Sequence, residues 1–424
     1  MTIEADRSYR ALFTIPELRK VVFSMQFARV AQAMTSVALV LFTLQKFNSP
    51  ALTGIVTALS ILPGLLISPL AGALLDRHGR VRLIRLDYIV AMATMILIAG
   101  LSIAGLLTPE LLIIIAVVSS LTGPFSQTGM RSLFPLMVPE HLWERINAVD
   151  SNGYLIATIF GPPLAAALFA IFGGDAAILA IAVPYGIAAL LTLGVREPNV
   201  LAATSGRLLR DAWDGLRYAW SNLTIRGLIF SISALNVAWG ITTIVIPLLV
   251  IDRLDLPEWL VGIVYALSGV AGMISVFIFG RVDSRGREWR MLVYPMLPMA
   301  PVTALLLLAG SPAAVAAPVA GLAVMIASQF LLGLLGGPMD IALFTMRQRR
   351  TDPAWIGRAF AVSMALNFVG FPIGAALAGT LAAVSLELAI SAAVVATVVG
   401  VVFAIFLVPR NEPAEVAAPE VSRP

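Results

Sequence analysis

Long apolar stretches alternate with short polar connections along almost the whole chain. A run of about 20 apolar residues can cross the hydrocarbon core of a bilayer, and about twelve such runs occur here. Because lipid offers the backbone no hydrogen-bond partners, these spans must be helices that satisfy their own N–H and C=O groups. The predicted spans are residues 21–45, 52–75, 83–106, 110–133, 147–171, 176–195, 227–250, 259–281, 290–310, 315–341, 358–383 and 386–408.

The apolar pattern of the first half is repeated in the second half. Residues 54–80 are similar to residues 262–287, and in both copies the apolar stretch ends in a short polar segment. A repeat near half the length of a 424-residue chain indicates two copies of one unit, which here is a membrane bundle. We therefore predict an all-α integral membrane protein made of two pseudo-symmetric six-helix bundles.

A polar segment interrupts the apolar pattern between the two copies. In its second half, apolar residues that include Trp213 and Trp220 recur at helical spacing opposite arginines, which predicts an amphipathic helix in the membrane interface. Such a helix could couple the two halves or only tether them. The expected organisation is an N-terminal six-helix bundle at 1–195, a cytoplasmic linker at 196–226, a C-terminal six-helix bundle at 227–408 and a disordered cytoplasmic tail at 409–424.

The composition excludes most other classes of protein. Hydrophobic residues make up 59% of the chain and charged residues 12%, which is too apolar for a soluble protein of this length. The net charge of +4 is small and dispersed, so no nucleic-acid partner is expected. The chain has no cysteine, and His78 and His141 lie in predicted loops, so we expect no metal and no cofactor. The spans hold no nucleophile–base arrangement, so we expect no enzyme.

Arginine and lysine are concentrated in the connections that share one side of the predicted bundle with both chain ends. The connections of the other side carry only Lys46 and Arg253 as basic residues. The positive-inside rule then predicts a multi-pass protein of the cell membrane with both termini in the cytoplasm. The charged N-terminus lacks a cleavage-site pattern and is interpreted as a cytoplasmic tail.

The segment GALLDRHGR closely resembles the signature between the second and third helices of the major facilitator superfamily. The resemblance extends over essentially the whole chain. It implies the twelve-helix major facilitator fold and a monomeric transporter in which two halves rock about a midplane site. The signature positions are Gly72, Asp76, Arg77, Gly79 and Arg80 in the first copy, and Asp283, Gly286 and Arg287 in the second.

These signature residues could form a gate on the cytoplasmic side. Gly72 would let two helices approach closely, and Gly79 would permit a tight turn. Asp76 could face the N-terminus of the eleventh helix, where the helix dipole favours an anion, while the arginines could bind acids or lipid phosphates. Asp87, close to Arg85 at the start of the third helix, is expected to belong to the same gate. The alternative is that these charges only set the topology and form a solvated turn.

Two further segments, RDAWDGLRYAWSNLTIRGLI and RSLFPLMVPEHLWERINAVDS, resemble drug–proton antiporters of the macrolide-efflux and enterobactin-exporter type. The antiporter motif of the fifth helix is matched in part, because Gly161 and Pro162 are present but Ala157, Ala165 and Ala166 replace glycines. The resemblance implies efflux of drug-like or siderophore-like molecules. A proton-coupled importer and a lipid or lysolipid flippase of the same fold remain open, since small residues also serve to pack helices between the halves.

An ionisable residue within a membrane span is costly and therefore a functional candidate. Arg29 is the clearest, with Gln26 and Gln32 on nearly the same face of the first helix. It could bind an anionic substrate group, pair with a carboxylate, or only hold the fifth helix in place. Asp150 and Asp340 are the candidate carboxylates, because opening and closing a cavity changes the solvation and the charges that control protonation.

Further polar and aromatic residues could complete a substrate pocket, although each could instead serve in helix–helix packing. The expected partners are a small-molecule substrate, protons as the coupling ion, and membrane lipids. The additional pocket candidates are Gln127, Asn152, Tyr154, Asn236, Trp239, Tyr265, Gln329 and Asn367.

Overall fold

The structure is a computed structural model that describes residues 8–197, 208–282, 284, 286–352 and 355–411, all of them in helices or connections. The helices of the first half are α1 (Tyr9–Thr14), α2 (Leu18–Phe47), α3 (Pro50–Leu59), α4 (Leu62–His78), α5 (Arg80–Ile103), α6 (Pro109–Ser120), α7 (Gly123–Met137), η1 (Glu140–Leu142), α8 (Trp143–Phe172) and α9 (Gly174–Leu191). They are followed by α10 (Leu208–Ser221), α11 (Leu223–Leu248), η2 (Leu249–Arg253), α12 (Trp259–Phe279), α13 (Glu288–Met296), α14 (Met299–Ala309), α15 (Pro312–Ala316), α16 (Pro318–Arg349), α17 (Ile356–Phe368), α18 (Gly370–Val384) and α19 (Leu386–Leu407).

Twelve segments of the described chain are helical, long and apolar enough to cross a membrane, which confirms the twelve predicted spans. Several spans are made of two helices in line, such as α3–α4, α6–α7 and α17–α18. Pro63 and Pro124 lie in the first turns of α4 and α7, where a proline removes no helical hydrogen bond. Each proline therefore lets a new helix begin inside the span.

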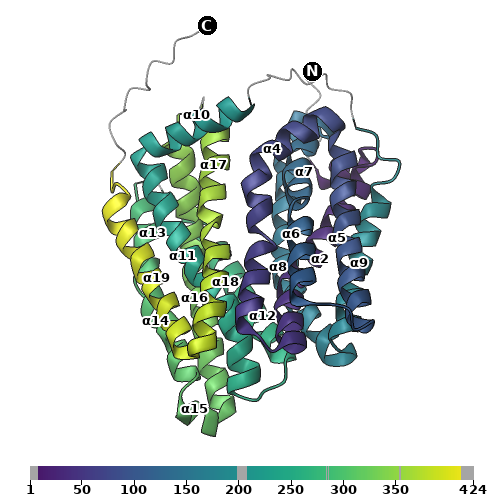
Figure 1. Cartoon of the computed structure of the whole chain (residues 1–424). Helices are drawn as coiled ribbons and strands as arrows, with labels where there is room; N and C mark the ends of the chain where they lie inside the picture. Colours follow the sequence, from purple (N-terminus) through teal and green to yellow (C-terminus); the bar gives the residue numbers. More distant parts are fainter. Residues whose placement is uncertain (1–7, 198–207, 283, 285, 353–354, 412–424) are drawn as a thin grey trace, which may run out of the picture.

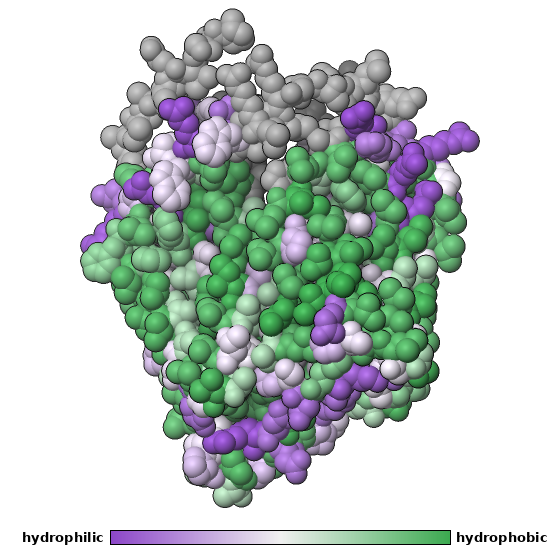
Figure 2. Space-filling view, viewed as in Figure 1, coloured by the Kyte–Doolittle hydropathy of each residue, from purple (hydrophilic) through white to green (hydrophobic). Residues whose placement is uncertain are grey.

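The helices form two bundles that lie side by side (Figure 1), as the repeat predicts. Helix α10 crosses one end of the molecule, and the start of α2 and the end of α19 lie at this same end. We call it the linker end and the opposite end the distal end. Figure 2 shows a broad hydrophobic belt between hydrophilic residues near both ends, and large apolar side chains such as Leu66 and Phe277 are exposed on the helices. A belt of this kind is stable when lipid surrounds it.

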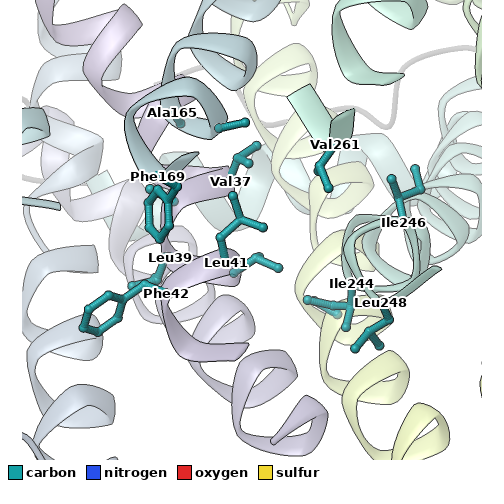
Figure 3. Close-up of a cluster of buried hydrophobic side chains, with 14 of the residues drawn as sticks. Val37, Leu39, Leu41, Phe42, Ala165, Phe169, Ile244, Ile246, Leu248 and Val261 are labelled. Carbon is teal, nitrogen blue, oxygen red and sulfur yellow. The ribbon is translucent and has the colours of Figure 1, made fainter. Parts of the chain in front are cut away.

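The apolar core is continuous between the halves only toward the distal end, within the described residues. One buried cluster there joins side chains of both halves, among them Val37, Phe169, Ile244 and Val261 (Figure 3). Toward the linker end each half has a buried cluster of its own, around Tyr88 in the first half and Met296 in the second. The halves are thus joined at the distal end and separately packed at the linker end.

Small residues bring the two halves into contact. A methyl group on Gly54 of α3 would lie 2.4 Å from the carbonyl oxygen of Ala375 on α18, which is closer than real carbon atoms approach. On the other side of the molecule, a methyl group on Gly262 of α12 would lie 2.8 Å from Pro163 of α8. Glycine at these positions permits backbone-to-backbone packing, as is usual between membrane helices.

Residues 208–221 of the predicted linker form the helix α10, which packs against protein. Tyr218 stacks on Trp355 with 5.1 Å between the ring centroids, and its hydroxyl accepts a hydrogen bond of 2.9 Å from the backbone N–H of Asp352. Helix α10 also contacts α4 of the first half, while Trp213 and Trp220 stay exposed. These contacts favour a coupling helix over a passive tether. Residues 198–207 of the predicted linker and 412–424 of the predicted tail lie outside the described residues.

Candidate transport site

Arg29 and Asp150 form an ion pair inside the first bundle. Arg29 projects from α2 and Asp150 from α8, and the Nη2 to Oδ1 distance is 2.5 Å. The second guanidinium nitrogen of Arg29 donates to the backbone carbonyl of Asp150. The side chains are 16% and 13% exposed, so both charges are largely removed from solvent and each depends on the other. The predicted partnership of these two residues is present in the structure.

A glycine makes room for this pair. Gln26, one turn before Arg29, donates from Nε2 to the carbonyl of Gly153 at 3.1 Å. A methyl group on Gly153 would lie 2.4 Å from Gln26 Oε1 and 3.3 Å from Arg29 Nη1. The absence of a side chain at Gly153 therefore allows two polar side chains of α2 to reach the backbone of α8. Gln32, predicted to share this site, is exposed and no hydrogen bond of its side chain is found among the described residues.

A second arginine lies within ion-pair distance of the Asp150 carboxylate. Arg131 of α7 places Nε 3.9 Å from Asp150 Oδ2, and its side chain is 71% exposed. Arg131 lies near the end of the predicted fourth span, 110–133, and is not among the site residues expected from the sequence. Its position one turn or more before the helix end, inside an apolar stretch, was the signal that could have identified it.

Three candidates of the second half, Asn236, Trp239 and Asn367, lie on α11 and the neighbouring α17. Asn236 Nδ2 donates to the backbone carbonyl of Asn367 at 3.0 Å. Trp239, one turn further along α11, is half exposed and packs edge-on against Phe371 at 5.0 Å between ring centroids and against Phe368 at 6.4 Å. This arrangement offers an accessible aromatic surface beside amide groups, which suits a flat amphipathic molecule.

Arg347 of α16 is a buried cation that lies beyond the end of the predicted tenth span, 315–341. It is 1% exposed and donates from Nη1 to the sulfur of Met364 at 2.8 Å. When the Asn367 amide is oriented to satisfy its neighbours, its oxygen accepts from Arg347 and its nitrogen donates to the Ser363 carbonyl at 3.1 Å. Arg347 thus connects α16 to α17 beside the Asn236–Asn367 contact.

The remaining pocket candidates do not join either group through a side-chain hydrogen bond among the described residues. Tyr265 donates to the backbone carbonyl of Thr243 at 3.2 Å, and the Nε2 of Gln329 is buried with no partner in the described part of the chain. The side chains of Gln127, Asn152, Tyr154 and Asp340 are exposed.

Asp87 lies elsewhere than expected. The sequence suggested a place in the cytoplasmic gate, but the residue is two turns into α5 and 7% exposed. The expectation that Asp87 belongs to the gate is therefore wrong, because the periodicity of α5 turns this position into the bundle.

The predicted gate residues are only partly described. Arg80 pairs with Glu197 at 3.0 Å, which joins the start of α5 to the segment after α9 within the first half. Gly79 and Gly286 adopt φ values of +88° and +70°, which favour glycine at both turns. Arg77 and Arg287 are exposed. Asp283 and the side-chain environments of Gly72 and Asp76 lie outside the described residues.

The motif residues of the fifth span, on α8, contact α2 within the first bundle and α12 of the second bundle. A methyl group on Gly161 would lie 2.5 Å from Ala33 Cβ on α2, so this glycine serves packing inside the first bundle and not between the halves. The carbonyl of its neighbour Pro162 lies 3.4 Å from the methyl position of Gly262 on α12. Ala166, whose Cβ lies 2.9 Å from the same methyl position, and Pro162 are therefore members of the motif at the contact between halves.

Comparison with known proteins agrees with this architecture. The MFS-type transporter y4rN of Sinorhizobium fredii is 36% identical over 390 residues, which cover 91% of this chain and 93% of the relative. Macrolide efflux protein A of Streptococcus pyogenes is 21% identical and the multidrug efflux pump Tap of Mycobacterium bovis is 25% identical, over 83% and 85% of this chain and 86% of each relative. The crystal structure of the nucleoside transporter NupG superposes with a TM-score of 0.68 at 15% identity, over 91% of this chain and 96% of NupG.

The family model described as Major Facilitator Superfamily matches residues 21–318. This match begins within α2, includes the rest of the first bundle and continues well into the second. Together with the twelve spans and the paired bundles, it shows that the protein belongs to the major facilitator superfamily of membrane transporters.

Proposed function

We propose that this transporter exports small amphipathic molecules, drug-like or siderophore-like, in exchange for protons. The distant relatives with efflux names support export, and the accessible aromatic surface at Trp239 supports an amphipathic substrate. The charges inside the bundle support an ion-coupled cycle. A charged residue in a membrane span is energetically costly and usually marks a functional position.

The observation that carries this proposal is the Arg29–Asp150 pair with Arg131 beside it. Two guanidinium groups around one carboxylate leave positive charge on the site, which favours an anionic or strongly polar substrate group. A substrate or a proton that competes for the Asp150 carboxylate would remove one of the two bonds by which Arg29 holds α8. The contact between α2 and α8 would then depend on what the site has bound.

The arrangement of the cores supports alternating access. The continuous core at the distal end closes that side, and the separate cores at the linker end leave the halves free to move apart there. With both termini in the cytoplasm of the cell, as the distribution of arginines favours, this conformation opens toward the cytoplasm. Rocking of the two bundles would then expose the site to the other side. We propose a monomer in the cell membrane, surrounded by lipid.

A proton-coupled importer is the main alternative, and the fold of the nucleoside transporter NupG is compatible with it. The direction of coupled flux separates the two. An exporter moves substrate against the direction of the proton, whereas an importer moves both in the same direction. A lipid flippase would move labelled lipid in the absence of any soluble substrate.

The test is transport in proteoliposomes with an imposed pH gradient and a panel of lipophilic cations, macrolides and siderophores. We expect substrate-dependent proton flux that is lost in Arg29→Gln and Asp150→Asn and kept in Glu110→Gln, a change at an exposed carboxylate that starts α6. A rate of substrate transport that does not depend on the pH gradient would refute proton coupling. Proton and substrate moving in the same direction would refute export.

A further inference from the structure

The outer surface of the second bundle carries arginines and exposed aromatic side chains where α11 and α19 reach the linker end. We propose that this surface is a binding site for an anionic phospholipid of the membrane leaflet at the linker end. The headgroup would lie over the contact between α11 and α19 and bind Arg226 and Arg410, and the acyl chains would lie on Phe230 and Phe403. The inference concerns the lipid-facing surface and does not depend on which substrate is transported.

Helices α11 and α19 meet backbone to backbone at this end. A methyl group on Gly227 of α11 would lie 2.5 Å from the carbonyl oxygen of Leu407 on α19, so only glycine permits this contact. Arg226 directly precedes Gly227, and Arg410 follows Leu407 by three residues. Helix α19 lies at the outer edge of the second bundle, away from the first bundle (Figure 1). Both arginines therefore extend from one contact between helices on the outside of the molecule.

The two arginines lie at the border between the apolar spans and the polar connections. Arg226 directly precedes the predicted span 227–250, and Arg410 follows the predicted span 386–408 by two residues. On the membrane side of Arg410, the side chains of Phe406 and Leu407 are exposed. A guanidinium group at the edge of an exposed apolar surface is at the depth of the phospholipid headgroups.

The positive charge of these arginines is not neutralised within the described part of the chain. None of the ion pairs found among the described residues includes Arg226 or Arg410. Arg226 is partly exposed and donates from Nη1 to the carbonyl oxygen of Trp220 at 3.4 Å, and Arg410 is exposed. A guanidinium group has five N–H donors, so most of them remain available for a phosphate group, which arginine binds through paired hydrogen bonds.

Arg410 is held in place by its neighbours in the protein. Arg350 donates to the carbonyl oxygens of Pro409 at 2.7 Å and of Arg410 itself at 3.3 Å. Trp289 donates from Nε1 to the carbonyl oxygen of Val408 at 3.0 Å, and the guanidinium carbon of Arg410 lies over the Trp289 ring, 4.7 Å from its centroid. Because the backbone and the side chain of Arg410 are already ordered, binding of a headgroup costs little further conformational entropy.

A row of aromatic rings lies beside the arginines and crosses three helices. Trp220 of α10 packs edge-on against Phe230 of α11, with 5.7 Å between the ring centroids, and Phe230 packs edge-on against Phe403 of α19 at 5.8 Å. Trp220 is 54% exposed and Phe230 is 36% exposed, so the row is accessible to lipid. Aromatic side chains are favoured at the membrane interface. Rings beside uncompensated cations match acyl chains below a negatively charged headgroup, so the surface should prefer an anionic lipid to a zwitterionic one.

The first test measures lipid binding by native mass spectrometry of the full-length protein, freed of lipid in a neutral detergent. We expect phosphatidylglycerol to bind more tightly than phosphatidylcholine, which has the same phosphate but no net charge. Arg226→Gln/Arg410→Gln should weaken the binding of phosphatidylglycerol about 25-fold, at about a factor of five for each basic residue. Arg226→Lys/Arg410→Lys should keep most of the binding. The matched control, Lys20→Gln/Arg82→Gln, removes two exposed charges at the linker end of the first bundle and should leave the binding unchanged.

The second test locates the lipid, because bromine atoms on the acyl chains quench the fluorescence of nearby tryptophans. Brominated phosphatidylglycerol should quench more strongly than brominated phosphatidylcholine, and this excess should disappear in Trp220→Phe/Trp289→Phe. Excess quenching that persists in this variant, or equal loss of lipid binding in the two glutamine double variants, would overturn the inference. Displacement of phosphatidylglycerol by an excess of inorganic phosphate would also overturn it, since the arginines would then bind a free anion and not a lipid.

Discussion

Arg29 binds Asp150 twice, once through the carboxylate and once through the backbone carbonyl of the same residue. The second bond ties the arginine to the course of α8 itself, so the pair connects two helices and not merely two side chains. Removal of one partner would leave the other charged, desolvated and unpaired. The pair is therefore a structural element of the first bundle as well as the centre of the proposed site.

Removing the charge of either Arg29 or Asp150 alone should lower the free energy of unfolding more than removing both charges. Breaking a buried ion pair by removing one partner typically destabilises a protein by about 3–5 kcal/mol, whereas an apolar replacement of both is often neutral. We expect Arg29→Met to lower the thermal unfolding temperature clearly and Arg29→Met/Asp150→Leu to recover most of it. Tryptophan fluorescence during heating in detergent measures this. Equal destabilisation by the single and the double change would contradict the pairing.

Gly153 should not tolerate a side chain. Alanine there would place its methyl group 2.4 Å from Gln26 Oε1, so Gln26 must give up its bond to the α8 backbone. We expect a loss of about 1–3 kcal/mol, the usual cost of overpacking. Gln26→Ala in the same chain should relieve the clash and recover part of the loss. Gly123→Ala, whose methyl group would meet nothing within 4 Å, is the control.

Closure at the distal end should depend on Gly54. A methyl group there would meet the Ala375 carbonyl at 2.4 Å, so Gly54→Ala should favour conformations in which the distal ends of α3 and α18 separate. The chain contains no cysteine, so spin labels can be placed on Leu106→Cys and Val384→Cys, two exposed distal positions, without other changes. Double electron–electron resonance should then show that the distribution of distances between the two spin labels has shifted to longer distances. Gly100→Ala, in open space, should leave the distribution unchanged.

Helix α10 should contribute to the rate of transport. Tyr218→Ala removes the stack on Trp355 and the acceptor of the Asp352 N–H, contacts that hold the linker against the second half. An aromatic pair contributes about 0.5–1.5 kcal/mol beyond its buried area. We expect a severalfold slower substrate exchange in proteoliposomes with unchanged equilibrium binding of the substrate. Trp213→Ala, at an exposed position of the same helix, should have little effect, and equal slowing in both variants would argue for a simple membrane tether.

The architecture of this protein could be predicted from the amino-acid sequence alone. The length and apolar character of each span follow from the thickness of the bilayer, and the repeat of the segment at Gly54 in the segment at Gly262 implies two bundles. The signature around Gly79 identified the superfamily before any contact was known. These features are local or periodic, and so they can be read along the chain.

Which polar residues come into contact depends on how the helices pack in three dimensions. The pairing of Arg29 with Asp150 could be predicted from the sequence, because both residues lie at similar depth in apolar spans. The approach of Arg131 to the same carboxylate and the burial of Asp87 inside the first bundle could not be predicted in this way. Sequence spacing gives the depth and the face of a residue on its own helix, whereas its neighbours depend on how each helix is rotated against the next. That rotation is set by close contacts such as Gly153 on Gln26, which involve residues more than a hundred positions apart.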